Sequence, residues 1–287
     1  RKFRKILYGA PILKKNSIGT WICSYNMINL EILTNSEFEW FTIDLEHSAM
    51  SLDQCFSIVS FIKSSTKKSC FVRMSDLSQS NIKRVLDFGV DGIILPMVKD
   101  ENDIKNIIDA AHYPPVGSRG TGLFRAQEHG DNFENYIKNS YENTKIIIQI
   151  EHIDAINNLE ALLKEKHING LIIGPYDLSA SLGEPGNFES EKFKNAITKF
   201  EDLCSNTDKD MGYHIAFPDT DKLKNLLNSG YNFIGYSTDI LLFKAQMDIV
   251  NKDLLTTALT HKSANQNNNN EKLEFLGDRV LGLVLSK

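Results

Sequence analysis

The amino-acid sequence predicts an α/β fold, and within that class a TIM (β/α)8 barrel. Short apolar runs bounded by Gly, Pro or Asp alternate along the chain with stretches whose apolar residues recur at helical spacing. Eight such pairs fit into roughly 235 residues, a count and length typical of this barrel. Doubly wound sheets also alternate strands with helices, but the Gly-rich dinucleotide turn that such sheets often carry follows none of these runs. The barrel is therefore the favoured architecture.

The predicted strands are short and almost wholly apolar, as suits parallel strands that are buried on both faces. In chain order we place them at residues 19–24, 40–45, 70–74, 92–98, 145–150, 170–173, 211–215 and 233–236. An amphipathic stretch follows each strand and predicts an outer helix. These helices are expected at residues 27–34, 52–63, 80–88, 101–111, 154–166, 190–206, 219–228 and 239–250.

Composition and charge narrow the class of protein. The chain is 41% apolar, enough for a large core, and its net charge of −5 gives the barrel no electrostatic footprint for nucleic acid. The four cysteines show no CxxC spacing, which predicts neither a zinc site nor disulfides and favours a reducing cytoplasm. The basic start of the chain has an apolar run of about eight residues that Pro11 interrupts, too short for a membrane span. We expect a cytoplasmic protein with no membrane partner.

Ionisable residues gather where the predicted strands end. Functional side chains of a (β/α)8 barrel lie at the carboxyl ends of its strands, so these residues are expected on one rim. Taken singly, an Asp-x-x-His pair is more often a surface turn, and an arginine that closes a strand is usually a salt-bridge partner. An enclosed barrel mouth, however, rarely collects unpaired charges without use. Two carboxylates at neighbouring strand ends can also bind one hard cation. The residues are Asp44, Glu46 and His47 after the second run, Arg73 after the third, Glu151 after the fifth and Asp177 after the sixth.

Seven motifs resemble the HpcH/HpaI family of class II pyruvate aldolases, within the phosphoenolpyruvate/pyruvate barrel superfamily. The resemblance covers about residues 19–250 and keeps the family's order and spacing. It implies a carbon–carbon lyase that cleaves or forms a 4-hydroxy-2-oxo acid from pyruvate and an aldehyde through a metal-stabilised enolate. The motifs are GTW (19–21), IDLEH (43–47), VR (72–73), LPMV (95–98), YPPVGSRGTG (113–122), QIE (149–151) and GPYDLSASLG (174–183).

The same resemblance implies a metal site and a substrate site. Glu151 and Asp177 are the implied ligands of a divalent cation, which oxygen ligands and Lewis-acid chemistry suggest is Mg²⁺ or Mn²⁺, with Co²⁺ as a further candidate. Arg73 is implied on the pyruvate keto oxygen, where it adds fixed positive charge. The backbone around Gly174, Tyr176 and Asp177 is implied to receive the pyruvate carboxylate.

The resemblance also implies how protons move. His47 is the implied acid–base residue, and Asp44 is its implied orienting partner, which would fix the imidazole tautomer and raise its basicity. Members of the family commonly form homo-oligomers, so we expect a homo-oligomer here.

Three points stay open on the sequence alone. A Schiff-base aldolase would need a desolvated lysine at a strand end, for which Lys99 is the candidate. Arg119 and Arg125, in a Gly-rich stretch, could recognise an acidic aldehyde or a neighbouring subunit, or could be solvated. His214, at the end of the seventh run, could be packed or could face the mouth.

Residues 251–287 read as a separate, short all-α segment joined to a barrel domain of residues 1–250. ALTHKS (258–263) and EKLEFLGDRVLG (271–282) are similar to the start of a bacterial ribonuclease III catalytic domain. A double-stranded RNA endonuclease is therefore the alternative function. That family's site also needs a second acidic pair and a partner subunit, so we expect residues 251–287 not to act as a nuclease by themselves. The acids of one helix face that would be vestigial ligands are Glu271, Glu274 and Asp278.

Overall fold

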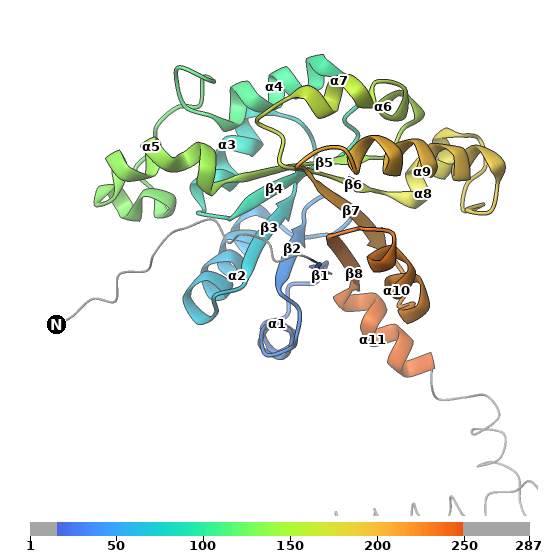
Figure 1. Ribbon diagram of the computed structural model, residues 1–287. Coiled ribbons are helices and arrows are strands. Elements are labelled where there is room, and N and C mark those ends of the chain that lie inside the picture. Colours follow the sequence, from blue (N-terminus) through green and yellow to red (C-terminus); the bar gives the residue numbers. More distant parts are fainter. Residues whose placement is uncertain (1–15, 249–287) are drawn as a thin grey trace, which may run out of the picture. The chain divides into compact units, whose positions relative to one another are not determined.

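The computed structural model describes residues 16–248, and within them eight parallel strands close into a barrel (Figure 1). Each strand pairs with the next in the chain, and β8 pairs with β1. The predicted (β/α)8 fold is confirmed. The strands are β1 Ser17–Ile22, β2 Trp40–Asp44, β3 Ser69–Arg73, β4 Gly92–Leu95, β5 Lys145–Ile150, β6 Gly170–Ile173, β7 Asp210–Ile215 and β8 Phe233–Thr238.

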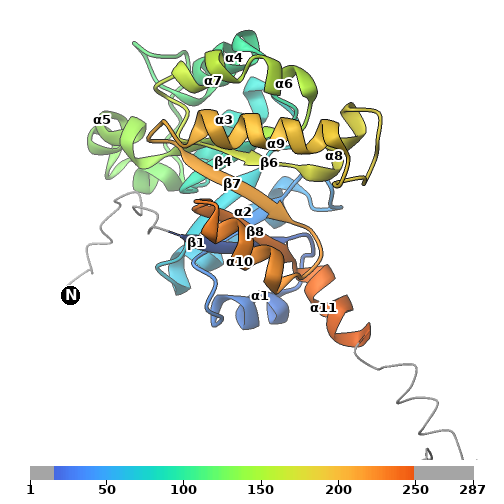
Figure 2. The same cartoon turned by 45° about the vertical axis from the view of Figure 1, so that its right-hand side comes forward.

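Helices surround the closed sheet, as turning the molecule between Figure 1 and Figure 2 shows. No helix within residues 16–248 is long and apolar enough to cross a membrane. The helices are α1 Met27–Thr34, α2 Leu52–Ser65, α3 Gln79–Asp87, α4 Glu101–Ala111, the 3-10 helix η1 Arg125–Gly130, α5 Phe133–Asn143, α6 Ile153–Asn157, α7 Leu159–Lys164, α8 Pro175–Ser181, α9 Glu191–Cys204, α10 Thr220–Asn228 and α11 Asp239–Asp248.

The chain divides into two compact units, residues 1–241 and 242–287. The first holds the barrel strands, and residues 242–248 are the part of the second that the structure describes. The predicted ribonuclease-like segment, residues 251–287 with Glu271, Glu274 and Asp278, lies outside the described residues.

The main differences from the sequence prediction lie in the helices and in the fourth strand. The helix expected over 154–166 is split into α6 and α7, because Asn158 leaves the helical backbone at the junction. The stretch after Gly174, for which no helix was predicted, forms α8, with Pro175 in the first turn, where proline is well tolerated. η1 and α5 were not expected as helices. The fourth strand is shorter than predicted and ends at Leu95.

The interior of the barrel is filled by large apolar side chains, which we call the interior layer. Trp40 stacks on Phe233 with ring centroids 4.2 Å apart. Gly19 makes room for this stack, because a Cβ there would lie 2.0 Å from the Trp40 ring. The barrel is therefore a packed core and not a pore. The interior layer consists of Trp21, Trp40, Phe71, Ile94, Ile147, Ile172 and Phe233.

Candidate active site

We call the carboxyl end of the barrel strands the mouth. An ion pair between the last residues of β2 and β3 lies there. Asp44 and Arg73 are register partners in the two strands, and both side chains are buried. Arg73 donates from Nε to Asp44 Oδ1 at 2.9 Å and from Nη2 to Oδ2 at 2.6 Å. Burial alone would raise the pKa of Asp44, but the hydrogen bonds and charge of Arg73 lower it overall. Asp44 is therefore ionised and binds the guanidinium through a bidentate ion pair.

Arg73 is fixed on a second side by an aromatic ring. Its guanidinium carbon lies 4.5 Å from the ring centroid of Trp21, within the range of a cation–π contact. With Nε and Nη2 bound to Asp44, Nη1 is left for other groups, and it lies 3.2 Å from Glu46 Oε2. The guanidinium is thus positioned before any substrate arrives.

Glu151 is a buried carboxylate at the end of β5, only 2% exposed. Oε1 accepts from Gln149 Nε2, and Oε2 accepts from the Met97 backbone N–H, both at 2.9 Å. Met97 has a left-handed backbone with φ of +54°, uncommon for a residue other than glycine. The pKa of Glu151 is raised to about 7, chiefly by burial and in smaller part by the charges of Glu46 and Asp177, against the opposing effect of the Met97 N–H and Arg73.

Glycine at position 174 allows Glu151 to lie against the start of α8. A Cβ at Gly174 would be 2.6 Å from Glu151 Cγ and 2.7 Å from Oε1, closer than real Cβ atoms come. The first turn of α8 then carries Tyr176 and Asp177, both exposed. Asp177 adds a charge that raises the pKa of both Glu151 and Glu46, so these three carboxylates face one region.

His47 extends from the loop after β2, and its side chain is 64% exposed. We expected Asp44 to orient its ring, but Asp44 Oδ1 accepts the backbone N–H of His47 at 3.2 Å. The carboxylate that faces the ring is Glu46, whose Oε2 is 3.9 Å from His47 Nε2. The physical reason is that both oxygens of Asp44 are taken by Arg73.

The charges at the mouth suit a divalent cation. Asp44 neutralises Arg73, which leaves Glu46, Glu151 and Asp177 with excess negative charge, part of it desolvated. Oxygen donors of this kind match the preference of Mg²⁺ and Mn²⁺. Within residues 16–248 no three His, Cys, Asp or Glu side chains are grouped so as to hold a metal ion. The predicted site of two carboxylates, Glu151 and Asp177, would take its other ligands from substrate oxygens and water.

Sequence reasoning missed some polar groups at the mouth. Cys23 Sγ lies 3.5 Å from Asp44 Oδ2, and burial and nearby carboxylates raise the pKa of this thiol. Asp239, after β8, accepts the backbone N–H groups of Cys23 at 2.8 Å and Ser24 at 3.1 Å. Gln149 Oε1 is buried without a partner among the described residues. The strand-end rule covers Asp239, while Gln149 shares the inward face of Glu151 two residues earlier.

His214, left open by the sequence, is packed at the mouth. Its ring centroid is 4.7 Å from that of Trp21, and its Nε2 is buried without a partner among the described residues. Burial and the charge of Arg73 lower its pKa to about 3. His214 is therefore a neutral imidazole.

Arg119 belongs to the scaffold. It is buried and donates from Nη2 to Asp87 Oδ1 at 2.6 Å, with its guanidinium 4.7 Å from the Tyr113 ring centroid. The interpretation of Arg119 as a solvated residue is therefore wrong. Arg125 donates to the Phe88 carbonyl at 2.9 Å. Lys99 is half-exposed just after β4.

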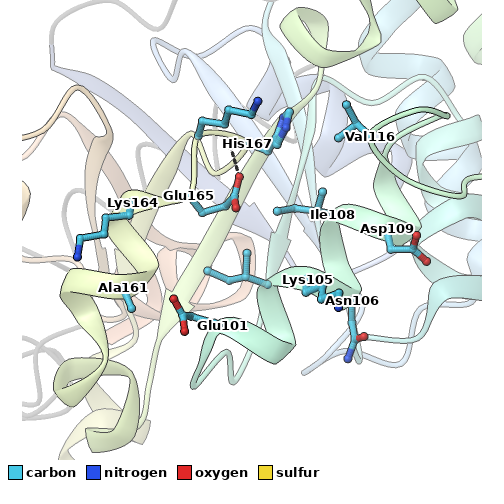
Figure 3. A pocket seen from close by; sticks show the side chains of 12 residues that line it. Glu101, Lys105, Asn106, Ile108, Asp109, Val116, Ala161, Lys164, Glu165 and His167 are labelled. Atoms are coloured by element: carbon cyan, nitrogen blue, oxygen red, sulfur yellow. Dashed lines mark hydrogen bonds between the residues drawn. The ribbon is translucent and has the colours of Figure 1, made fainter.

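A cavity of about 660 Å³ lies away from these groups, between α4 and α7 on the outside of the barrel (Figure 3). Its lining mixes Lys105 and Lys164 with acids such as Glu101, and it includes no predicted site residue. We therefore place the candidate active site at the mouth, where charge converges on buried groups.

Comparison with known proteins places the chain among aldolases. The family model HpcH/HpaI aldolase/citrate lyase matches residues 17–245. A 2-keto-3-deoxy-L-rhamnonate aldolase of Salmonella gallinarum is 30% identical over 233 residues, 80% of this chain and 86% of the relative. The enzyme of the same name from Klebsiella pneumoniae is 30% identical over 236 residues, 82% of this chain and 87% of the relative.

Solved structures show the same fold. An HpcH/HpaI aldolase from Desulfitobacterium hafniense superposes with a TM-score of 0.76 at 24% identity, covering 86% of this chain and 94% of that one. An HpcH/HpaI aldolase/citrate lyase family protein from Burkholderia cenocepacia gives a TM-score of 0.77 at 22% identity, covering 82% and 93%.

Proposed function

The chain belongs to the HpcH/HpaI aldolase/citrate lyase family, and from this premise we propose that it is a class II aldolase, dependent on a divalent metal ion. It would cleave or form a 4-hydroxy-2-oxo acid, with pyruvate and an aldehyde as the other side of the equilibrium. The observation that carries this proposal is the buried carboxylate of Glu151, which faces two further carboxylates beside the fixed guanidinium of Arg73.

The names of the curated relatives support a proposal for the substrate class. A 2-keto-3-deoxy sugar acid carries a 2-keto and a 4-hydroxy group, and breaking its C3–C4 bond yields pyruvate and an aldehyde. We propose a substrate of this class for the present chain. Arg119 is bound to Asp87 and gives no support to an acidic aldehyde.

Glu151 and Asp177 are the proposed metal ligands, with Mg²⁺ or Mn²⁺ as the ion and Co²⁺ as a further candidate. A bound divalent cation supplies Lewis acidity at the keto and carboxylate oxygens of the substrate. Gly174 supports the site by giving the Glu151 carboxylate room beside α8.

Arg73 is the proposed stabiliser of negative charge on the C2 oxygen. Asp44 and Trp21 hold the guanidinium in place, so little reorganisation is needed when charge develops. The backbone near Gly174, Tyr176 and Asp177 is the proposed site for the substrate carboxylate.

His47 is the proposed acid–base residue. In the cleavage direction it takes the proton of the C4 hydroxyl, the C3–C4 bond breaks, and the electron pair moves to the C2 oxygen. His47 then returns a proton to C3, which gives pyruvate. Exposure of the imidazole at the mouth allows it to reach a substrate held on Arg73.

Exchange of the pyruvate C3 protons in D₂O, followed by NMR, tests this function without knowledge of the aldehyde. We expect exchange that EDTA abolishes and Mg²⁺ or Mn²⁺ restores. Exchange that survives EDTA would instead favour a Schiff base at Lys99. No exchange from folded, metal-loaded protein would overturn the proposal.

We further propose that the protein is cytoplasmic and homo-oligomeric, with a barrel domain of residues 1–250 and a separate segment after it. Two side chains one helical turn apart on α1 support a contact with another chain: Ile28 is 72% exposed and Ile32 is 65% exposed. Sedimentation equilibrium of the full chain would test the oligomer.

A further inference from the structure

Glu46 lies between two groups of the proposed active site. Its Oε2 is 3.2 Å from Arg73 Nη1 and 3.9 Å from His47 Nε2. The side chain is only 17% exposed, and Oε2 is fully enclosed without a hydrogen bond from any described residue. One carboxylate oxygen is thus held by charge alone between the guanidinium and the imidazole.

Asp44 cannot take this place in the structure. Its Oδ1 accepts from Arg73 Nε and from the backbone N–H groups of Glu46 and His47. Its Oδ2 accepts from Arg73 Nη2 and Cys23 Sγ. With five donors around it, Asp44 anchors the loop after β2 by its backbone, and the ring of His47 is left to another carboxylate.

We propose that Glu46 is a positioning residue that orients the His47 imidazole and couples it to Arg73. This inference rests on the proposed function for its catalytic meaning. A carboxylate beside Nε2 favours the tautomer that carries the proton on that nitrogen, which leaves Nδ1 as the base. When the substrate O–H bond breaks and an N–H bond forms on Nδ1, the imidazolium gains a negative neighbour. Glu46 itself takes no proton in this step.

Five charged or titratable groups face Glu46 and influence its pKa. His47 lies in its own loop, Arg73 faces it from β3, Asp44 from β2, Asp177 from α8 and Glu151 from the end of β5. Burial raises the pKa of Glu46, Arg73 and His47 oppose the shift, and Asp44 and Asp177 add to it. Removal of the Glu46 carboxylate should therefore affect first the two groups nearest to it, the Arg73 guanidinium and the His47 imidazole.

The test is an NMR titration of histidine ring signals in the full chain without substrate, which needs no aldolase activity. The His47 signal is identified among seven histidines by its loss in His47→Gln. We expect Glu46→Gln to lower the His47 titration midpoint by roughly half a pH unit or more, because the imidazolium loses its negative neighbour. Glu46→Asp should recover part of the shift.

A matched control removes one exposed charge elsewhere. Glu189 pairs with Lys194 at 2.7 Å and is 86% exposed, so Glu189→Gln should leave the His47 midpoint in place. Circular dichroism of each variant establishes that it is folded. An unchanged His47 midpoint in folded Glu46→Gln would overturn the proposal.

Proton exchange at pyruvate C3 gives the second readout. In Glu46→Gln the rate should fall roughly 10-fold or more, with little change in the pyruvate concentration needed for half-maximal rate. The acidic limb of its pH profile should move with the His47 midpoint. If wild type shows no exchange, the proposed function fails while the titration still decides the pairing. If exchange persists at full rate with an unmoved pH profile, the pairing has no role in the reaction.

Discussion

The interior layer and the mouth are built from the same strands, yet their side chains are opposite in character. β3 carries Phe71 and, two residues on, Arg73. β5 carries Ile147, and Glu151 follows directly after the strand ends, four residues on. Inward-facing residues recur every second position, so each step of two moves up one layer of the barrel. All four side chains are almost fully buried. Burial lowers the free energy of the two apolar side chains, Phe71 and Ile147, but is costly for the two ionisable ones, Arg73 and Glu151. The interior layer therefore stabilises the fold, while the mouth holds the groups suited to chemistry.

The largest expected effect is on activity at the mouth. Glu151→Gln removes the charge of a proposed metal ligand while it keeps the size of the side chain. We expect metal-dependent exchange of pyruvate C3 protons to fall by about 10³-fold or more, since a metal ion contributes several kcal/mol to such reactions. NMR in D₂O measures the rate. If the variant kept more than a tenth of the wild-type exchange rate, Glu151 would not be a ligand of the catalytic metal ion.

The corresponding change in the interior layer should act on stability. Trp40→Ala removes a fully buried ring that stacks on Phe233, and we expect a loss of about 3–5 kcal/mol in the free energy of unfolding. Urea unfolding followed by circular dichroism measures it. A loss below about 1 kcal/mol would mean that the interior layer is not the main support of the barrel.

The charge of Glu151 should itself reduce stability when metal is absent. The folded-state pKa is raised to about 7 from the ordinary 4.5, so the folded state binds a proton that the unfolded state releases. Stability is full below pH about 4.5 and is lost as the pH rises through about 7, by roughly 3 kcal/mol. Urea unfolding in EDTA at pH 5 and pH 8 should show this loss for wild type. In Glu151→Gln the difference in unfolding free energy between pH 5 and pH 8 should be smaller. The same pH dependence in the variant and in wild type would contradict the prediction.

A smaller effect is expected from backbone packing beside Glu151. Gly174→Ala adds a methyl group 2.6 Å from Glu151 Cγ, so the carboxylate must move. We expect Mn²⁺ affinity, measured by calorimetry, to fall roughly 10-fold, as for other supports of metal ligands. Gly120→Ala is the control, because its Cβ would meet only Lys83 Cδ at 4.0 Å. Equal affinities in the two variants would show that this packing does not matter for the metal.

The sequence was sufficient for the barrel and for the strand-end positions of the candidate site, because period and strand order decide both. It was not sufficient to predict which side chains of the site contact one another. Asp44 and Arg73 meet through the parallel register of β2 and β3, which no local pattern encodes. Assignment of the His47 ring to Asp44 therefore failed in the structure, where Glu46 faces it. The role of Glu151 as a desolvated group became visible only with the packing of Gly174 and Met97 around it.

The stacked rings of Trp40 and Phe233 have a kinetic consequence. They fill the barrel below the mouth, so every ligand must arrive and depart through one opening. In the proposed reaction the pyruvate half lies on buried Arg73 and Glu151, deeper than the aldehyde half. The order of binding is then set by depth: in synthesis pyruvate enters before the aldehyde, and in cleavage the aldehyde leaves first. Product-inhibition patterns should accordingly be those of an ordered mechanism, with pyruvate as the last product released.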